Sequence, residues 1–328
     1  MNINEIAKMA GVSRATVSRY LNKGYVSDEK KERIQEVIDR TGYKPSAQAR
    51  TLRTKKTRLI GVILPKINSD SISRMTAGIG AVLKEAGYQL LLANTENREK
   101  EELEYLRLFA RNHVDGIILI ATILTREHRR ALKALQVPVV LLGQKLDGYS
   151  CVYQDDCLAA RDVSRLLLQG AGKTACIGVT QQDEAVGAGR REGFLEAAQE
   201  AGISEEAVCF LETGFSVEDG YRAAERLLKI CPEADAVFCA TDSIALGAFA
   251  RLQEAGKRIP EDVALAGVGD TMSGRIISPK LTSVHFYYQT SGKEAARLLL
   301  ELLEGSEARK QIKMGYRVEE RGTTRRQL

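Results

Sequence analysis

The sequence predicts an α/β protein with an N-terminal helix-turn-helix domain and a core of two doubly wound subdomains, each built on a parallel sheet. Two observations predict this division. Residues 1–58 carry 14 Lys and Arg against 6 Asp and Glu, whereas the rest of the chain carries 34 against 37. From residue 59 onward, short apolar runs alternate with amphipathic stretches, a pattern typical of parallel sheets covered by helices. The length of 328 residues also allows two domains.

The first 43 residues have the pattern of three short helices. The first helix has one apolar face and ends at Gly11. The second is expected over residues 14–21, where Ser13 can cap its first turn. The third begins after Ser27 and runs to Gly42. Three short helices with a tight turn between the first two predict a helix-turn-helix domain.

Eight apolar runs predict the strands of the core. They are LIGVIL (59–64), YQLLLAN (88–94), DGIILI (115–120), VPVVLL (137–142), ACIGVT (175–180), AVCFL (207–211), AVFCA (236–240) and VALAGV (263–268). Because the runs are apolar on both faces, we expect sheets covered on both sides. Two series of runs, which meet near residues 143–156, predict two subdomains. Open parallel sheets bind ligands beyond their carboxyl ends, so we expect a binding cleft between the subdomains.

The composition excludes several classes of protein. With 44% hydrophobic residues the chain can bury a core, but no apolar stretch approaches the roughly 18 residues of a membrane span. The N-terminus lacks the apolar block of a secretory signal, so we expect a soluble, cytoplasmic protein. The six cysteines form no CxxC pair and the three histidines lie far apart. We therefore expect no metal, no cofactor and no disulfide framework.

The second predicted helix carries residues that can recognise the major groove of DNA. In the segment SRATVSR (13–19), Arg14, Ala15 and Arg19 point outward while Val17 points inward. An arginine can bind two acceptors on guanine, and an alanine can contact a thymine methyl group. From this pattern alone, a surface helix of another small bundle with solvated charges remains an alternative.

The stretches INEIAKMAGVSRATVSRYLN and VSDEKKERIQEVIDRTGYKPSAQARTLRT resemble the N-terminal signature of the lac repressor family of bacterial regulators. LIGVILPKINS and HVDGIILI continue the resemblance into the effector-binding core of that family, which is similar to periplasmic binding proteins. The resemblance covers essentially the whole chain. Two departures are that Ser46 replaces the usual asparagine after Tyr-x-Pro, and that the turn after Asn22 is one residue shorter than in some members.

The resemblance implies a helix-turn-helix domain over residues 1–45, a hinge helix and linker over 46–58, and an effector-binding and dimerisation core over 59–328. Base-edge contacts in the major groove are implied for Arg14, Ala15 and Arg19. Contacts to phosphates, which set register rather than sequence, are implied for Asn2, Thr16, Ser18, Asn22, Tyr25 and Ser27, and Ser13 belongs to the same surface.

The resemblance also implies that a hinge helix over residues 46–53 enters the minor groove when two subunits pair on an operator. Its DNA contacts are expected from Ser46, Ala49, Arg50, Leu52 and Arg53. Leu52 occupies the position of a wedging leucine, which unstacks base pairs and is compensated by contacts with the bent duplex. Each subunit has one helix-turn-helix domain, which we call its reading head. We therefore expect a homodimer on a pseudo-palindromic site of double-stranded DNA.

Candidate effector contacts lie just after the predicted strands. Arg190 begins an Arg-x-x-Gly-Phe segment (190–194) that resembles the family motif whose arginine grips the effector. Without the resemblance, the same arginine reads as a surface residue of an amphipathic helix. The full set of candidates is Ser69, Ser71, Ile72, Gln144, Arg190, Phe215, Thr241, Asp242, Asp270, Phe286 and Tyr288.

The candidate site departs from the family at three places. Gly143 replaces a frequent aspartate, Thr241-Asp242 replaces an Asn-Asp pair, and Gly269-Asp270 replaces an Asp-Asp pair. We therefore expect a less acidic and roomier site, which favours a neutral di- or oligosaccharide over a purine or an amino acid. A phosphosugar remains an alternative effector. In this region the sequence resembles repressors of the sucrose and trehalose type most.

The sequence as a whole predicts a sequence-specific repressor of a carbohydrate-utilisation operon, released from DNA when a sugar shifts the population of two conformations. No GxSxG or GxxxxGK[ST] motif is present, so we do not expect an enzyme. The alternatives are a corepressor-dependent regulator or an activator of the same fold. A sugar-binding protein without a DNA role is more remote, because it would have no use for residues 1–58.

Replacing Leu52 by alanine tests the expected wedge. The variant Leu52→Ala should bind operator DNA several-fold more weakly, because the bent duplex loses the side chain that holds its base pairs apart. Sugar binding should be unchanged, since the wedge lies outside the core. A titration that gives equal operator affinity for the variant and the natural chain would contradict this role.

Overall fold

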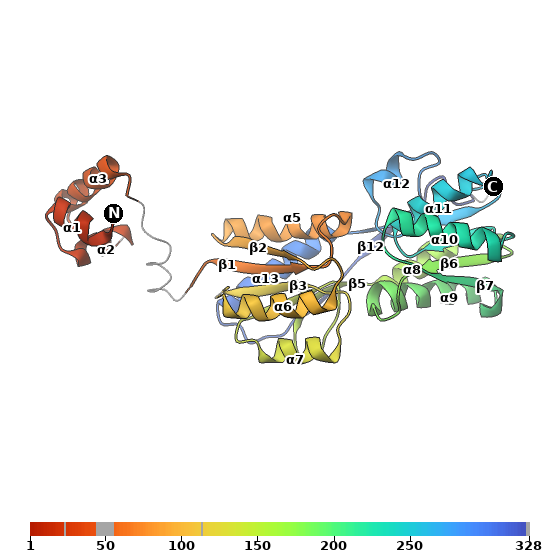
Figure 1. Ribbon diagram of the computed structural model, residues 1–328, viewed down its shortest axis with the longest axis horizontal. Helices are drawn as coiled ribbons and strands as arrows, with labels where there is room; N and C mark the ends of the chain where they lie inside the picture. The colour runs from red at the N-terminus through yellow and green to blue at the C-terminus, as the bar shows by residue number, and fades with distance from the viewer. Residues whose placement is uncertain (23, 44–55, 113, 326–328) are drawn as a thin grey trace. The chain divides into compact units, whose positions relative to one another are not determined.

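The computed structural model of the chain describes residues 1–22, 24–43, 56–112 and 114–325 (Figure 1). The chain divides after Arg58 into two compact units. The predicted hinge residues, which lie outside the described ranges, are Ser46, Ala49, Arg50, Leu52 and Arg53.

In the described part of the first unit, residues 1–58, three helices lie at the predicted positions: α1 (Ile3–Ala10), α2 (Arg14–Leu21) and α3 (Asp28–Thr41). Gly11 follows α1 with a left-handed φ of 63°, a conformation that favours glycine and ends the helix. A small apolar core joins the three helices through Ile6, Ala7, Ala10, Val17, Ile34 and Val37. This core fixes the outer face of α2.

The second unit begins with a subdomain built on a parallel sheet of strand order β11-β5-β4-β3-β1-β2. The strands are β1 (Leu59–Leu64), β2 (Gln89–Asn94), β3 (Gly116–Ile120), β4 (Val139–Leu142), β5 (Ser150–Gln154) and β11 (Gln311–Met314). One face packs on α5 (Asp70–Glu85) and α13 (Tyr288–Leu303), and the other on α6 (Glu99–Arg111) and α7 (Arg126–Ala134). Both faces are therefore covered, as predicted.

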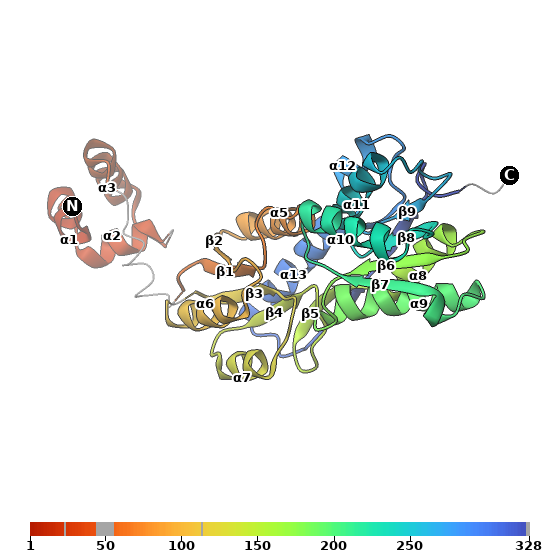
Figure 2. The same ribbon diagram turned by 45° about the vertical axis from the view of Figure 1, so that its right-hand side comes forward.

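The second subdomain is built on a parallel sheet of order β7-β6-β8-β9 and an antiparallel pair, β10 with β12. The strands are β6 (Thr174–Gly178), β7 (Val208–Glu212), β8 (Ala236–Cys239), β9 (Ala264–Ala266), β10 (Ser283–Phe286) and β12 (Tyr316–Glu319). The main helices are α8 (Asp156–Leu167), α9 (Arg190–Glu200), α10 (Val217–Ile230) and α11 (Asp242–Glu254), and the short ones are η1 (Glu184–Gly189), η2 (Glu205–Ala207) and α12 (Met272–Ile276). Figure 2 shows α9 and α10 on opposite faces of this sheet.

The chain passes between the two subdomains three times: from β5 to α8, from β10 to α13, and from β11 to β12. The predicted junction near residues 143–156 contains the first of these crossings, and the other two were not predicted. The C-terminal segments α13 and β11 belong to the first subdomain. The sequence hides this because β5, β10, β11 and β12 are short, and the last two alternate polar with apolar residues.

The strand β2 differs from the prediction of burial on both faces. It lies at the edge of its sheet, and Leu91 and Leu92 are 40% and 43% exposed. The same apolar composition that predicts a buried strand here produces an exposed apolar edge. Exposed sheet edges of this kind are sites of association unless they are blocked.

Glycines allow the main helix pairs to approach closely. A Cβ atom built at Gly78 of α5 would lie 2.0 Å from the carbonyl oxygen of Gln289, and one at Gly292 of α13 would lie 2.0 Å from that of Met75. Real Cβ atoms do not approach backbone oxygens so closely. The contact between α5 and α13 therefore depends on these two glycines.

Replacing Gly292 by alanine should lower the free energy of unfolding by about 1–3 kcal/mol, because the added methyl group forces α13 away from α5. Denaturant unfolding of the full chain measures this change. The control is Gly172→Ala, where the added Cβ would meet only the Asp235 carboxylate at an ordinary 3.7 Å. Equal stability of the two variants would contradict the close packing.

Candidate functional site

The outer face of α2 presents the residues expected to read DNA. Arg14, Ala15 and Arg19 are exposed, whereas Val17 is fully buried in the core of the first unit. Ser13 caps the helix: its Oγ accepts a hydrogen bond of 3.1 Å from the backbone N–H of Thr16. The cap and the core together hold the two arginines on one accessible surface.

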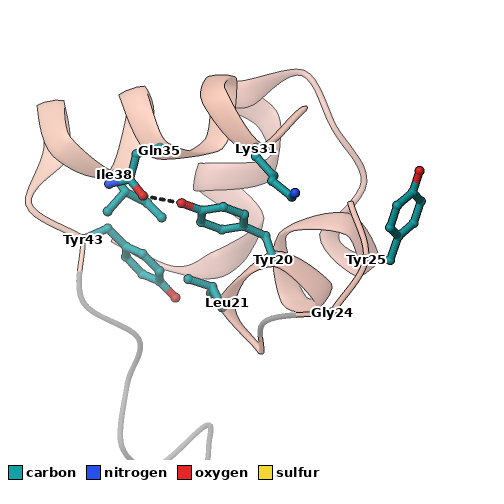
Figure 3. A pocket seen from close by; sticks show the side chains of 8 residues that line it. All are labelled: Tyr20, Leu21, Gly24, Tyr25, Lys31, Gln35, Ile38 and Tyr43. Carbon is teal, nitrogen blue, oxygen red and sulfur yellow. Dashed lines mark hydrogen bonds between the residues drawn. The ribbon is translucent and has the colours of Figure 1, made fainter. Parts of the chain in front are cut away.

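The other residues expected at phosphates lie around α2 in the same unit. Tyr25 is 87% exposed, and in Figure 3 its ring stands apart from those of Tyr20 and Tyr43, which lie beside α3. Asn2 caps α1 in a reciprocal arrangement with Glu5, which leaves it exposed at the helix terminus. The remaining members are Ser18 and Thr16, which are half-buried, and Asn22 and Ser27, which are exposed.

The candidate effector residues follow the carboxyl ends of strands in both subdomains, where the two subdomains meet. We use the word cleft for this junction of the two subdomains, which the sequence predicts as the binding region. Its members in the first subdomain are Ser69, Ser71 and Ile72 at the start of α5, Gln144 after β4, and Tyr288 at the start of α13. Its members in the second are Arg190 at the start of α9, Phe215 before α10, Thr241 and Asp242 at the start of α11, Asp270 after β9, and Phe286 at the end of β10.

Arg190 is the most strongly anchored residue of the cleft. It is 4% exposed, and its Nε donates a hydrogen bond of 2.7 Å to Oδ1 of Asp156, which is 5% exposed. Its Nη1 donates a hydrogen bond of 2.6 Å to the carbonyl oxygen of Ala240, and its guanidinium lies 5.6 Å from the ring centroid of Phe286. The arginine therefore joins α8, α9, β8 and β10. The sequence analysis did not single out Asp156 as its partner.

The two carboxylates Asp242 and Asp270 are held by other residues of the second subdomain. Asp242 accepts hydrogen bonds of 2.6 Å from Ser283 Oγ and 2.7 Å from the backbone N–H of Thr271, and burial raises its pKa. Burial alone would also raise the pKa of Asp270. Hydrogen bonds from two arginines and a histidine nevertheless lower it well below its usual value; these residues are Arg275, Arg321 and His285.

The aromatic candidates occupy different environments. Phe286 is fully buried in the core, and Tyr288 is almost buried beneath the guanidinium of Arg74, which lies 5.1 Å from its ring centroid. Phe215 is half-buried and packs against the core on the α10 side. Phe286 therefore lies beside Arg190, whereas Phe215 belongs to a different apolar cluster.

Two of the hydrogen bonds among the described residues cross the cleft from the first subdomain to loops of the second. Gln144 Nε2 of the first subdomain donates to Oδ1 of Asp183 in the second, at 2.8 Å. Arg74 Nη2 of α5 donates to the carbonyl oxygen of Gly269 after β9, at 2.6 Å. Arg74 and Asp183 are not among the residues predicted from the sequence. The position of Asp183 soon after β6 was the available signal, but a single aspartate ahead of a π-helical turn has no distinctive pattern.

The cleft has the chemistry of a binding site. It contains hydrogen-bonding groups of both kinds, namely arginine and amide donors and carboxylate acceptors, which are largely buried together with the rings of Phe286 and Tyr288. Among the described residues, no group of three or more His, Cys, Asp or Glu side chains is placed to hold a metal ion. No helix in the described part of the chain is long and apolar enough to cross a membrane.

The buried pair Asp156–Arg190 can be tested against an exposed pair between the same two helices. Asp156→Ala should lower the free energy of unfolding by about 3–5 kcal/mol, because it leaves a buried cation without its counter-charge. The control is Glu200→Ala, which breaks the half-exposed pair with Arg165 and should cost less than about 1 kcal/mol. Urea unfolding checks both values, and equal losses would contradict the anchoring role of Asp156.

Comparison with known proteins gives matches to both parts of the chain. Residues 2–46 match the family described as bacterial regulatory proteins, lacI family, and residues 163–324 match the periplasmic binding protein-like domain. The chain is 33% identical over 304 residues to the sucrose operon repressor of Staphylococcus xylosus, covering 92% of this chain and 94% of that protein. It is 31% identical over 329 residues to the HTH-type transcriptional repressor PurR of Vibrio atlanticus, covering 98% of each.

A solved structure of the transcriptional regulator CelR in complex with cellobiose superposes with a TM-score of 0.74 at 28% identity, covering 98% of this chain and 99% of that one. These relatives carry the names of transcriptional repressors or regulators, which agrees with the prediction of a regulator rather than an enzyme. The matches also confirm the predicted α/β fold with its helix-turn-helix domain. The chain belongs to the lacI family of bacterial regulatory proteins.

Proposed function

We propose that this chain is a cytoplasmic repressor of a carbohydrate-utilisation operon that binds its operator as a homodimer and is released by a neutral sugar. The observation that carries the proposal is the combination, in one chain, of an exposed reading face on α2 with a cleft bridged by polar side chains. The first can bind DNA and the second can bind a small polar ligand. The two functions are coupled if the ligand changes how the subdomains meet.

The DNA-binding half of the proposal rests on Arg14, Ala15 and Arg19. Their exposure next to a buried Val17 gives α2 one outward face with two cations and a small residue between them. Such a face can donate bidentate hydrogen bonds to guanine and contact a thymine methyl group. The hinge segment, residues 46–53, adds minor-groove contacts in this proposal.

The dimer is supported by exposed apolar residues of the core. Leu91 and Leu92 lie on the free edge of β2, and Met272 and Ile276 of α12 are 67% and 74% exposed. Exposed apolar side chains in both subdomains favour a second copy of the chain as the covering partner. Two copies would bring two reading heads to a pseudo-palindromic operator.

The sugar half of the proposal rests on the polar groups of the cleft. Gln144, Arg190 and Asp183 offer amide, guanidinium and carboxylate groups that can pair with adjacent hydroxyls. Two relatives also point in this direction, since one is named as a sucrose operon repressor and another was solved with cellobiose. A purine effector, as in the name PurR, is the competing possibility that the ligand test below must exclude.

In the proposed mechanism, the sugar binds where hydrogen bonds cross the cleft and changes how strongly the two subdomains are held together. The three connections between the subdomains at residues 154–156, 286–288 and 314–316 act as the hinge about which they rotate. A sugar that favours one rotation lowers the fraction of dimers whose reading heads match the operator. Coupling of this kind typically amounts to about 1–3 kcal/mol.

Enrichment of duplexes from a randomised library tests the proposal. The full chain should select two inverted half-sites, and sucrose, cellobiose or trehalose should release the selected duplex, whereas purines should not. Arg14→Ala should lose preference at one base pair in each half-site by about 1–3 kcal/mol. The control Lys8→Ala removes an exposed cation of α1, and it should change the affinity for all duplexes by the same factor. Enrichment without inverted repeats, or release by purines alone, would contradict the proposal.

A further inference from the structure

Asp183 is a buried carboxylate with one oxygen left without a partner. The residue is 1% exposed. Its Oδ1 accepts hydrogen bonds from Gln144 Nε2 at 2.8 Å and from the backbone N–H of Val186 at 2.9 Å. Its Oδ2 is buried and has no hydrogen-bond partner among the described residues. A buried acceptor without a donor costs free energy, so this oxygen requires an explanation.

The surroundings of Asp183 restrict which ligand could supply the missing donor. Gln144 and Val186 donate neutral N–H groups, while Asp156 and Arg190 are the charged groups that act on it electrostatically. Arg190 is already neutralised by its pair with Asp156. No salt bridge to Asp183 occurs among the described residues, so its negative charge is not cancelled by a direct contact. Burial accordingly raises the pKa of Asp183.

We propose that Asp183 is an effector-binding residue, whose free oxygen accepts a hydrogen bond from a hydroxyl group of a neutral sugar and whose charge excludes sugar phosphates. This inference rests on the proposed function, and it names the ligand class for the same cleft. It also narrows the choice between a neutral disaccharide and a phosphosugar that the sequence leaves open.

Sugar phosphates are excluded because a phosphate group and the Asp183 carboxylate would place negative charges together in a buried site. A phosphate brings about two negative charges at neutral pH, and near a buried carboxylate neither charge is well solvated. A hydroxyl group instead donates a hydrogen bond to the carboxylate, and such bonds to charged groups are stronger than those between neutral groups.

The hydrogen bond from Gln144 also fixes the position of the Asp183 carboxylate before a ligand binds. It joins the subdomains at the same carboxylate that binds the sugar, so the ligand meets a carboxylate already held in place by Gln144 and Val186. Preorganisation of this kind reduces the ordering that binding must supply. The sugar therefore binds across the join between the two subdomains, where it can influence their relative rotation.

Asp183→Asn is the informative variant, because asparagine keeps the Oδ1 acceptor for Gln144 and Val186 and replaces the charged free acceptor by a neutral N–H donor. Because burial raises the pKa of Asp183, its ionisation destabilises the fold at neutral pH. The variant loses this cost but gains buried amide N–H groups that need acceptors, so thermal unfolding checks that it is folded before its affinity is measured. The matched control is Glu192→Gln, the same change at an exposed position of α9.

Calorimetric titration of the full chain with sucrose and trehalose, and with the 6-phosphate of each, tests the inference. The natural chain should bind a neutral sugar at least about 10-fold more tightly than its phosphate. Asp183→Asn should weaken neutral-sugar binding roughly 10- to 100-fold and narrow the preference over the phosphate by at least about 10-fold. Glu192→Gln should change neither quantity.

The outcomes separate this inference from the proposed function. If a neutral sugar binds and Asp183→Asn leaves both its affinity and the discrimination unchanged, the role of Asp183 is overturned while the sugar-responsive repressor stands. Tighter binding of the phosphate by the natural chain overturns the inference as well. If no neutral sugar binds although the operator is bound, the sugar half of the proposed function fails, and the role of Asp183 fails with it.

Discussion

The buried guanidinium of Arg190 is the group on which the arrangement of the core depends. Its hydrogen bonds reach Asp156, the second residue after β5, and the carbonyl oxygen of Ala240 at the end of β8. It also lies against Phe286, two residues before the chain returns to the first subdomain at Tyr288. A buried cation is stable only when its partners stay in place. One side chain therefore fixes two of the three connections between the subdomains.

This constraint explains how a ligand in the cleft could act at a distance. The residues that anchor the second subdomain, Arg190 and Asp242, belong to its own core and cannot move independently. The contacts that cross the cleft are fewer, and they include Gln144 with Asp183 and Arg74 with Gly269. A ligand bound among these contacts would change the balance between two arrangements of the subdomains rather than deform either of them. Packed cores respond in this all-or-none manner because they are not continuously deformable.

The sequence predicts well what depends on local pattern. The three N-terminal helices, eight strands and the exposure of Arg14 and Arg19 follow from periodicity and capping residues. The strands β10 and β12 and the return of α13 to the first subdomain depend on contacts between distant segments, which no local pattern reports. For the same reason the sequence identifies Arg190 as a candidate but not its partner Asp156, 34 positions earlier. Asp183 escapes notice because its significance lies in burial and in an unpaired oxygen.

The reciprocity of sugar and operator binding tests the central claim most directly. The dissociation constant of the operator should be measured with and without saturating sugar, and that of the sugar with and without saturating operator. Because coupling between two sites is reciprocal, both affinities should fall by the same factor, about 5- to 150-fold. An operator affinity that does not change on sugar binding, or two factors that differ, would contradict the coupling of the cleft to the reading heads.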